Sequence, residues 1–189
     1  MFLLDYIFGF ILQSTLIAIV VSTIAFAVYV FYKKQKSETY EKRFIVFCFV
    51  FYMTTLLYLT VYREGLFTNT SRTLNLYPFV TLISSFQLLY AQDALAAIGY
   101  VIYNVIGNIL WFMPLGYFLC IFHKNIKIYY VFWGSLLFSL TIEVVQYLCY
   151  VGISDIDDVI FNTLGGLTGY VVYILVKRGN RHEYKKTSA

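Results

Sequence analysis

Five long apolar runs limit the folds that are open to this sequence. A helix that crosses the hydrocarbon core of a bilayer needs about 20 mostly apolar residues. Five windows meet this requirement, at about 7–32, 44–62, 98–122, 128–150 and 159–176. Only 13% of the 189 residues are charged, against about a quarter in an average soluble domain. The sequence therefore predicts an all-α fold, namely a polytopic membrane helix bundle with about five transmembrane helices.

The basic residues are concentrated in three connecting segments, and this asymmetry predicts the topology. Twelve of the 14 Lys and Arg residues lie in 33–43, 123–127 and 177–186. Loops rich in Lys and Arg stay on the cytoplasmic side of a membrane, so we expect an N-out/C-in protein whose C-terminus is cytoplasmic. The net charge of +4 is explained by this topology, and it does not indicate a nucleic-acid partner.

The longest outer connection, from Arg63 to about Ala97, contains one amphipathic stretch. Residues 79–92 place apolar side chains on one helical face and Thr, Ser and Gln side chains on the other. This pattern is typical of a helix that lies in the membrane interface. We therefore predict an interfacial or re-entrant helix at 79–92 on the outer face, in addition to the five spans.

Polar residues inside the apolar runs converge on the outer ends of three predicted helices. Glu143 is the one deeply placed ionisable residue of these runs, and it shares a helical face with Gln146. Asn108 lies in the outer half of the third span, and Asn162 follows Asp158 by one turn in the fifth. Because polar and charged groups are costly inside a bilayer, we expect these residues to face the bundle interior and to line a polar pocket in the outer leaflet.

The acidic run from Ser154 to Asp158 has two interpretations. Ser154 and Asp157 match an S-x-x-D capping box, and acids in the first turn of a helix suit its dipole. Asp155 and Asp158, however, share a face that a cap does not require. With Asp157 they would form the rim of a pocket whose floor is Glu143. The run therefore predicts either a helix cap alone or part of a ligand site.

Structural roles are equally open for the other polar and small residues. Asn108 and Asn162 are also expected for hydrogen bonds between helices, and Gly165 and Gly169 form a small-xxx-small surface that is typical of close helix packing. The three cysteines are widely spaced and indicate neither a disulfide framework nor a zinc site. No Ser/His/Asp or Cys/His set can be assembled on one side of the membrane, which argues against a nucleophilic hydrolase.

Four motifs, taken in order, carry a resemblance to a known family. They are SRTLNLYPF (71–79), NVIGNILWFMPLGYFL (104–119), SLTIEVVQY (139–147) and SDIDDVIFNTLGGLTGY (154–170). In this order they resemble the VanZ-like family, small bacterial multi-helix membrane proteins of the cell envelope, named for a member of a glycopeptide-resistance cluster that gives low-level teicoplanin resistance. The resemblance implies a multi-pass protein of the bacterial cytoplasmic membrane. The expected regions are an N-terminal helix with a basic loop (1–43), a VanZ-like transmembrane domain (44–176) and a basic cytoplasmic tail (177–189).

The resemblance also implies which residues form the site. The family pattern matches Arg72, Asn75, Pro78, Asn108, Pro114, Gly116, Glu143, Gln146, Asp155, Asp157, Asp158, Asn162, Gly165 and Gly166. With Arg63 from the same outer loop, the polar members of this set are the predicted ligand-binding residues. Relatives often carry an arginine shortly before the aspartates, whereas this chain has Gly152 and Ile153 there. Arg63 or Arg72 would then have to hold an anion.

Two functions are open for such a site. In the first, it binds a membrane lipid, an envelope glycolipid, a teichoic-type polymer or a glycopeptide, with arginines on phosphate and carboxylates on sugar hydroxyls, and needs no cofactor. In the second, the protein is an intramembrane metal-dependent enzyme that acts on a lipid-linked phosphate or glycan. Asp155 and Asp158 would then hold Mg²⁺ or Mn²⁺, and Glu143 would be the general base.

Overall fold

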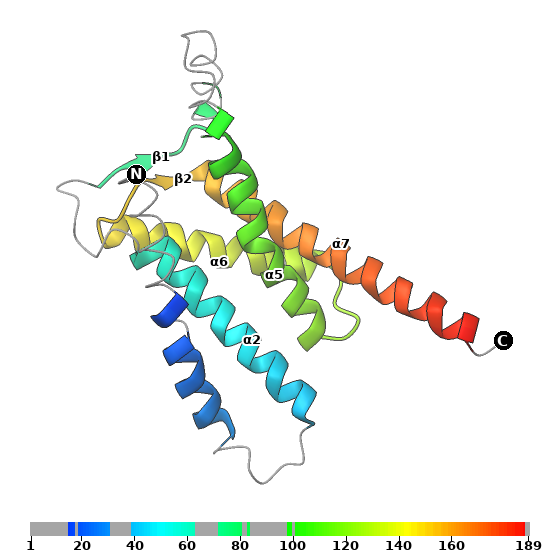
Figure 1. Ribbon diagram of the computed structural model, residues 1–189. Helices are drawn as coiled ribbons and strands as arrows, with labels where there is room; N and C mark the ends of the chain where they lie inside the picture. The colour runs from blue at the N-terminus through cyan, green and yellow to red at the C-terminus, as the bar shows by residue number, and fades with distance from the viewer. Residues whose placement is uncertain are drawn as a thin grey trace. The chain divides into compact units, whose positions relative to one another are not determined.

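The structure, a computed structural model, describes a mostly helical chain over residues 15–17, 19–30, 39–62, 72–80, 83, 98–99 and 101–187 (Figure 1). Four helices in these ranges are long and apolar enough to cross a membrane: Tyr40–Val61, Asn104–Phe122, Ile128–Leu148 and Ile156–Gly179. They coincide with four of the five predicted spans. The predicted count of five is not confirmed, because the apolar helix in the first window, Thr15–Val30, is shorter and the rest of that window lies outside the described residues.

Residues Met1–Thr68 form one compact unit. Its elements are the helix Thr15–Val30, the helix α2 (Tyr40–Leu57) and the π-helical turn η1 (Tyr58–Tyr62). The first helix contacts α2 through the rings of Phe26 and Phe47, whose centroids lie 5.6 Å apart in an edge-to-face arrangement. Such aromatic pairs are favourable beyond the area that they bury, so this contact helps to hold the two helices together.

Residues Asn69–Ala189 form a second compact unit. Its elements are β1 (Leu74–Asn75), the π-helical turn η2 (Ile102–Ile106), α5 (Gly107–Phe122), α6 (Ile128–Leu148), β2 (Ser154–Asp155) and α7 (Ile156–Thr187). The helices α5, α6 and α7 form a three-helix bundle (Figure 1). The turn 123–127 joins α5 to α6, and Asn125 within it has a φ of 68°, a left-handed conformation that Asn tolerates better than most residues.

The helix α7 is longer than a membrane is thick. Its 32 residues correspond to about 48 Å at 1.5 Å per residue, whereas the hydrocarbon core of a bilayer is about 30 Å thick. The apolar part ends at Gly179, and the following turns carry basic residues. The segment that we expected to be a basic tail after residue 176 therefore continues as helix as far as Thr187.

Small residues let the helices of this bundle approach very closely. A Cβ added at Gly165 would lie 2.5 Å from the carbonyl oxygen of Ile109, and one added at Gly169 would overlap the carbonyl oxygen of Met113. These contacts confirm the predicted small-xxx-small surface, which packs on α5. One turn further along α5, a Cβ at Gly116 would overlap the backbone of Gly166. Only glycine fits at these crossings.

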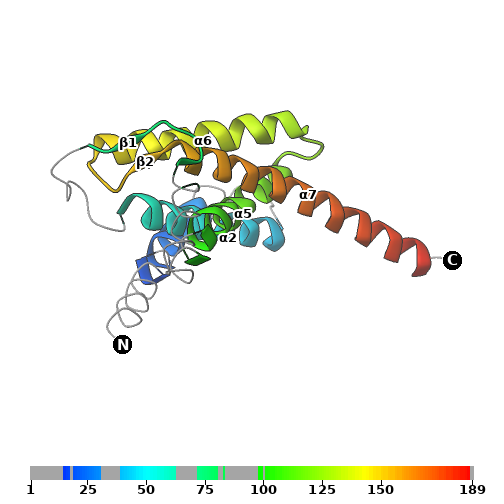
Figure 2. The ribbon, with the colours of Figure 1, turned by 90° about the horizontal axis from the view of Figure 1, so that it is seen from above.

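A two-stranded parallel sheet closes one end of the bundle. Leu74 of β1 pairs with Ser154 of β2, and Asn75 pairs with Asp155. Figure 2 shows β1 running beside β2 at one end of α6. The predicted all-α fold did not include this sheet, because strands of two residues carry no alternating sequence pattern. The sheet brings the loop 72–80 against the acidic run.

The predicted interfacial helix at 79–92 falls largely outside the described residues. Phe79, Val80 and Ile83 are described, and the N–H of Ile83 donates to the carbonyl of Phe79 at 2.8 Å. The rest of this helix stays a prediction, as do the N-out/C-in orientation and the boundaries of the three regions.

Candidate functional site

Glu143, near the end of α6, is turned into the bundle and holds the start of the next helix. Only 6% of its surface is exposed. Its Oε2 accepts a hydrogen bond from the backbone N–H of Asp155 at 2.9 Å, and its backbone carbonyl accepts one from the Ser154 hydroxyl at 3.1 Å. The prediction that Glu143 faces the acidic end of the last helix is therefore confirmed. Its carboxylate fixes the turn that leads into α7.

The N-terminus of α7 is capped by Asp155. The Oδ1 of Asp155 accepts the backbone N–H of Asp157 at 2.9 Å, which is the bond that an N-cap side chain makes. The predicted capping box, with Ser154 as the cap, is therefore wrong. Ser154 lies one residue earlier in extended backbone, and its hydroxyl donates to Glu143 instead.

Two of the aspartates hold the loop 72–80. The Oδ2 of Asp155 accepts from the Nδ2 of Asn75 at 3.0 Å, and the Oδ1 of Asp157 accepts from the backbone N–H of Phe79 at 2.7 Å. Asp157 is buried, with 4% of its surface exposed. Phe79 has a φ of 63°, a conformation that bulky residues rarely adopt. The hydrogen bond that its N–H donates to Asp157 helps to hold this strained residue in place.

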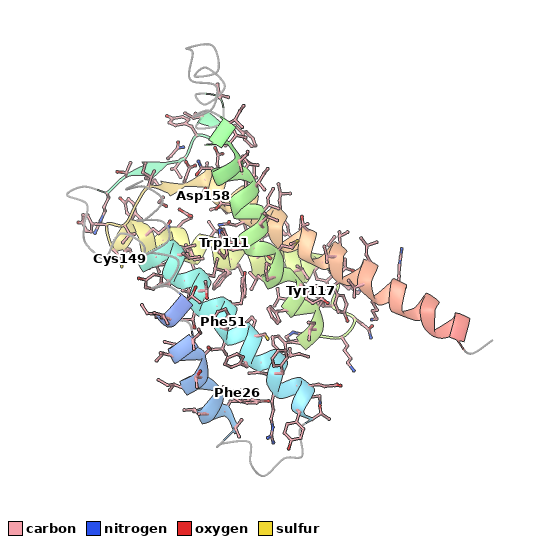
Figure 3. The ribbon with its side chains drawn as sticks, in the orientation of Figure 1. Phe26, Phe51, Trp111, Tyr117, Cys149 and Asp158 are labelled. Atoms are coloured by element: carbon pink, nitrogen blue, oxygen red, sulfur yellow. The ribbon has the colours of Figure 1, made fainter. Side chains whose placement is uncertain are left out.

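The third aspartate joins α7 to α5. The Oδ1 of Asp158 accepts from the Nδ2 of Asn108 at 2.6 Å, and Figure 3 shows Asp158 beside the start of α5. One turn deeper, the Nδ2 of Asn162 donates to the Ser139 hydroxyl at 2.9 Å, and both residues are buried. The predicted hydrogen bonds between helices are thus present. These bonds bring together six predicted residues, which we call the acidic cluster: Asn75, Asn108, Glu143, Asp155, Asp157 and Asp158.

Arg72 lies against tyrosines at the end of α6. Its guanidinium carbon is 5.2 Å from the ring centroid of Tyr147 and 4.8 Å from that of Tyr150. Both distances are within the range of cation–π attraction. The neighbouring residue, Thr73, accepts the backbone N–H of Ser154 through its carbonyl at 3.1 Å. Arg72 is therefore held beside the turn between α6 and α7. That turn itself contains no arginine.

The matches to known proteins cover the part of the chain that contains the acidic cluster. A family model described as VanZ/LLP1 matches residues 44–177. The protein called Protein VanZ, from Enterococcus faecium, is 31% identical over 140 residues, which cover 71% of this chain and 74% of that protein. The chain belongs to the VanZ/LLP1 family. No solved structure gives a significant match.

The structure does not bring every predicted site residue into the acidic cluster. Within the VanZ/LLP1 region, Gln146 accepts the backbone N–H of Val151 through its carbonyl at 3.0 Å, a contact that shapes the turn after α6. Arg63 lies outside the described residues, so its predicted part in anion binding stays a prediction. The ligand-binding role of the cluster as a whole also stays a prediction.

Sequence reasoning missed several partners of the VanZ/LLP1 aspartates and of Arg72. The backbone N–H of Phe79 and the Ser154 hydroxyl are donors that no motif singles out. Tyr147 and Tyr150, three residues apart, could have been recognised as an aromatic pair at the predicted membrane boundary, where tyrosine is enriched. Their contact with Arg72, by contrast, depends on the pairing of β1 with β2.

The described residues give little support to a metal site in this VanZ/LLP1 chain. Among them, no group of three or more His, Cys, Asp or Glu side chains is placed to hold a metal ion. Asp155 and Asp158, the predicted ligands, instead accept hydrogen bonds from the amide groups of Asn75 and Asn108. Mg²⁺ requires a near-octahedral shell of oxygen ligands, and an N–H donor directed at a carboxylate oxygen competes with such a cation.

Proposed function

We propose that this VanZ/LLP1 protein acts at the outer face of the bacterial cytoplasmic membrane and lowers susceptibility to teicoplanin. The resemblance to the VanZ-like family implies the resistance. The molecular step that we propose is binding of the headgroup of an envelope lipid, glycolipid or polymer at the acidic cluster. The observation that carries this proposal is the convergence of four carboxylates and two amides, from five separate elements, at one end of the bundle.

The position of the cluster in the bundle supports an outer-leaflet site. It lies where α5 and α7 begin and α6 ends. The opposite end of the bundle carries the turn 123–127, with Lys124 and Lys127, and the basic end of α7. Since basic segments stay in the cytoplasm, the cluster belongs at the outer ends of the helices.

The chemistry of the cluster suits a polyhydroxylated headgroup. Asp155, Asp158 and Asn108 are half-buried rather than fully enclosed, so their side chains are accessible in part. Ionised carboxylates form stronger hydrogen bonds with hydroxyl donors than neutral acceptors do. The proposal therefore assigns sugar or glycerol hydroxyls to the carboxylates and a phosphate to Arg72, which lies beside the turn between α6 and α7.

A susceptibility assay with charge-matched variants tests this function. The chain is expressed in a teicoplanin-susceptible host, and the minimal inhibitory concentration is measured for wild type, Asp158→Asn and Glu41→Gln. Asp158→Asn keeps an acceptor for Asn108 but removes the charge, so it should reach the membrane normally and lose the protection. Glu41 is an exposed acid in the first turn of α2, and Glu41→Gln should keep the protection. Full protection by Asp158→Asn at equal membrane levels would refute a role of this charge.

The enzymatic alternative differs in its dependence on metal. An intramembrane enzyme that uses Mg²⁺ or Mn²⁺ should lose turnover of a lipid-linked phosphate or glycan on chelation, whereas a binding protein should retain its ligand. We favour binding because the carboxylates of the described cluster are directed at N–H donors. Chelator-sensitive release of phosphate or sugar by the purified protein would reverse this choice.

A further inference from the structure

Residues 72–80, which we call the interface segment, expose a dense group of large apolar side chains. Leu76 and Tyr77 are 63% and 76% exposed, and Phe79 and Val80 are exposed as well. Four such side chains within five residues are unfavourable in water. An exposed apolar patch of this kind marks a surface that meets a membrane or another apolar partner.

The depth of the interface segment points to a membrane. The N–H of Phe79 is bonded to Asp157, the second residue of the candidate span Ile156–Gly179. The ring centroid of Phe79 lies 6.5 Å from that of Phe161, which is five residues into the same span, or about 7 Å along the helix axis. The segment therefore lies beside the end of a span, at the level of a bilayer interface.

The fold provides partners for several backbone groups of the segment from the protein side. Asn75 pairs with Asp155 through the sheet and through its side chain, and its Oδ1 accepts the N–H of Tyr77 at 3.2 Å. The N–H of Phe79 is bonded to Asp157. Unpaired backbone groups are what usually keeps a loop out of a bilayer. With these groups paired, the apolar side chains can enter the interface at little cost.

The other end of the segment carries a cation at the level of the headgroups. Arg72 is exposed and stacks on Tyr147, the penultimate residue of the candidate span Ile128–Leu148, and on Tyr150. Stacking occupies the faces of a guanidinium, while the N–H donors at its rim match two oxygens of a phosphate. The two aspartates that touch the segment are directed at N–H donors of Asn75 and Phe79 rather than at Arg72.

We propose that the interface segment binds an anionic phospholipid of the bilayer, with the phosphate on Arg72 and the upper part of the acyl chains around Leu76, Tyr77, Phe79 and Val80. Along the bundle, these groups follow the order of the parts of a lipid, with the headgroup outside and the acyl chains deeper. The cation, Arg72, lies at the end of a span, and Phe79 lies one turn deeper. This inference shares Arg72 with the proposed headgroup site, but it concerns phospholipids of the bilayer and does not require the proposed teicoplanin resistance.

Tryptophan fluorescence tests where the apolar end of the segment lies. The full-length protein, with Trp111 and Trp133 replaced by Phe, is placed in lipid nanodiscs and given a single tryptophan by Tyr77→Trp. We expect blue-shifted emission that lipids brominated on the acyl chains quench strongly. A single tryptophan at Lys124, an exposed residue of the turn 123–127, should emit at longer wavelength and be quenched less. Solvent-like, unquenched emission from Tyr77→Trp would overturn the proposal.

Native mass spectrometry tests the cationic end with two lipids, phosphatidylglycerol and the zwitterionic phosphatidylcholine. Wild-type protein should retain phosphatidylglycerol preferentially. Arg72→Gln should weaken this preference about fivefold, the effect expected for one basic residue at an anionic surface. The matched control is Lys127→Gln, because Lys127 also lies over a tyrosine, 5.9 Å from the ring centroid of Tyr129.

The control separates a built site from general electrostatics. If Arg72→Gln and Lys127→Gln lose the preference for phosphatidylglycerol to the same extent, the proposal is overturned. The loss of any positive charge would then weaken binding equally, whatever its position. If Arg72→Gln does not fold, Arg72→Lys serves in its place: it keeps the charge but loses the planar fork, and it should still bind phosphatidylglycerol more weakly than wild type. If Arg72→Lys binds phosphatidylglycerol as well as wild type does, positive charge alone accounts for the binding, and the stacked arrangement is refuted.

Discussion

Replacing Gly116 by alanine is expected to destabilise the contact between α5 and α7. The added Cβ would overlap the carbonyl oxygen of Gly166 and lie 2.7 Å from its carbonyl carbon, whereas relaxed carbon atoms stay about 3.5–4.0 Å apart. Both groups are helix backbone, so the helices would have to separate by about 1 Å. Overpacking of this kind costs about 1–3 kcal/mol, and the better helix propensity of alanine returns at most about 1 kcal/mol.

The bundle offers a matched control for this substitution. Gly134 lies inside α6, well away from its ends, and the nearest atom to an added Cβ is the Cδ1 of Leu119 at 3.4 Å. That atom is the end of a flexible side chain, so it can move aside. Gly134→Ala should therefore be neutral or stabilise the protein by up to about 1 kcal/mol through helix propensity. The two variants add the same methyl group in the same kind of helix.

Thermal unfolding in detergent, followed by the reactivity of Cys120, measures the difference. Cys120 is 1% exposed on α5, and replacing Cys48 and Cys149 by serine makes it the single thiol. A chain of this size changes its unfolding midpoint by about 2–4 °C per kcal/mol. Gly116→Ala should therefore melt several degrees below Gly134→Ala. If Gly116→Ala melts at or above the control, the backbones are not as close as described and the packing argument fails.

Three further predictions concern the acidic cluster and the topology. Glu143→Gln keeps an acceptor for the N–H of Asp155, whereas Glu143→Leu leaves that N–H unpaired and should cost about 1–3 kcal/mol more in the same unfolding assay; equal midpoints would contradict the bond. Asp155→Ala removes the N-cap and should lower stability by about 1 kcal/mol or more, and by more than Ser154→Ala, whereas the opposite order would restore Ser154 as the cap. A single cysteine at Asn69 should react with an impermeant reagent added from outside while one at Gln35 stays unlabelled, and the reverse result would place the acidic cluster on the cytoplasmic side.

Most of the helical fold could be predicted from the sequence, because the length of an apolar run is a local property. Four of the five predicted windows correspond to helices of membrane-crossing length. The glycines at 165 and 169 also gave the correct packing surface, since the spacing of small residues on a helix is local as well. The parallel sheet was missed because residues 74–75 and 154–155 are about 80 positions apart, and their pairing depends on tertiary structure alone.

The candidate site could be predicted in part, for the same physical reason. Counting residues from the ends of the spans placed Asn108, Glu143 and Asn162 at similar depth beneath the three aspartates, and the structure brings the elements that carry them together. The capping box failed because Ser-x-x-Asp is a short-range signal. The Ser154 hydroxyl has a competing acceptor, the carbonyl of Glu143, which lies 11 residues earlier in the chain. No local pattern reveals such a competitor.

The geometry of the acidic cluster raises the question of why its acceptors are carboxyl groups rather than amides. The donors in the bonds described above are neutral N–H groups, of Asn75, Phe79, Asn108, Asp155 and Asp157, and an asparagine or glutamine oxygen would accept each of these bonds. The positive end of the α7 dipole favours the aspartates. It does not explain Glu143, which belongs to the C-terminal part of α6, where the helix dipole gives a carboxylate no stabilisation. A structural role alone would therefore be filled at lower cost by glutamine. If Glu143→Gln matches wild type in unfolding midpoint and membrane level but loses protection against teicoplanin, the carboxyl group serves function. If it retains full protection, the hydrogen bond to Asp155 is all that this position contributes.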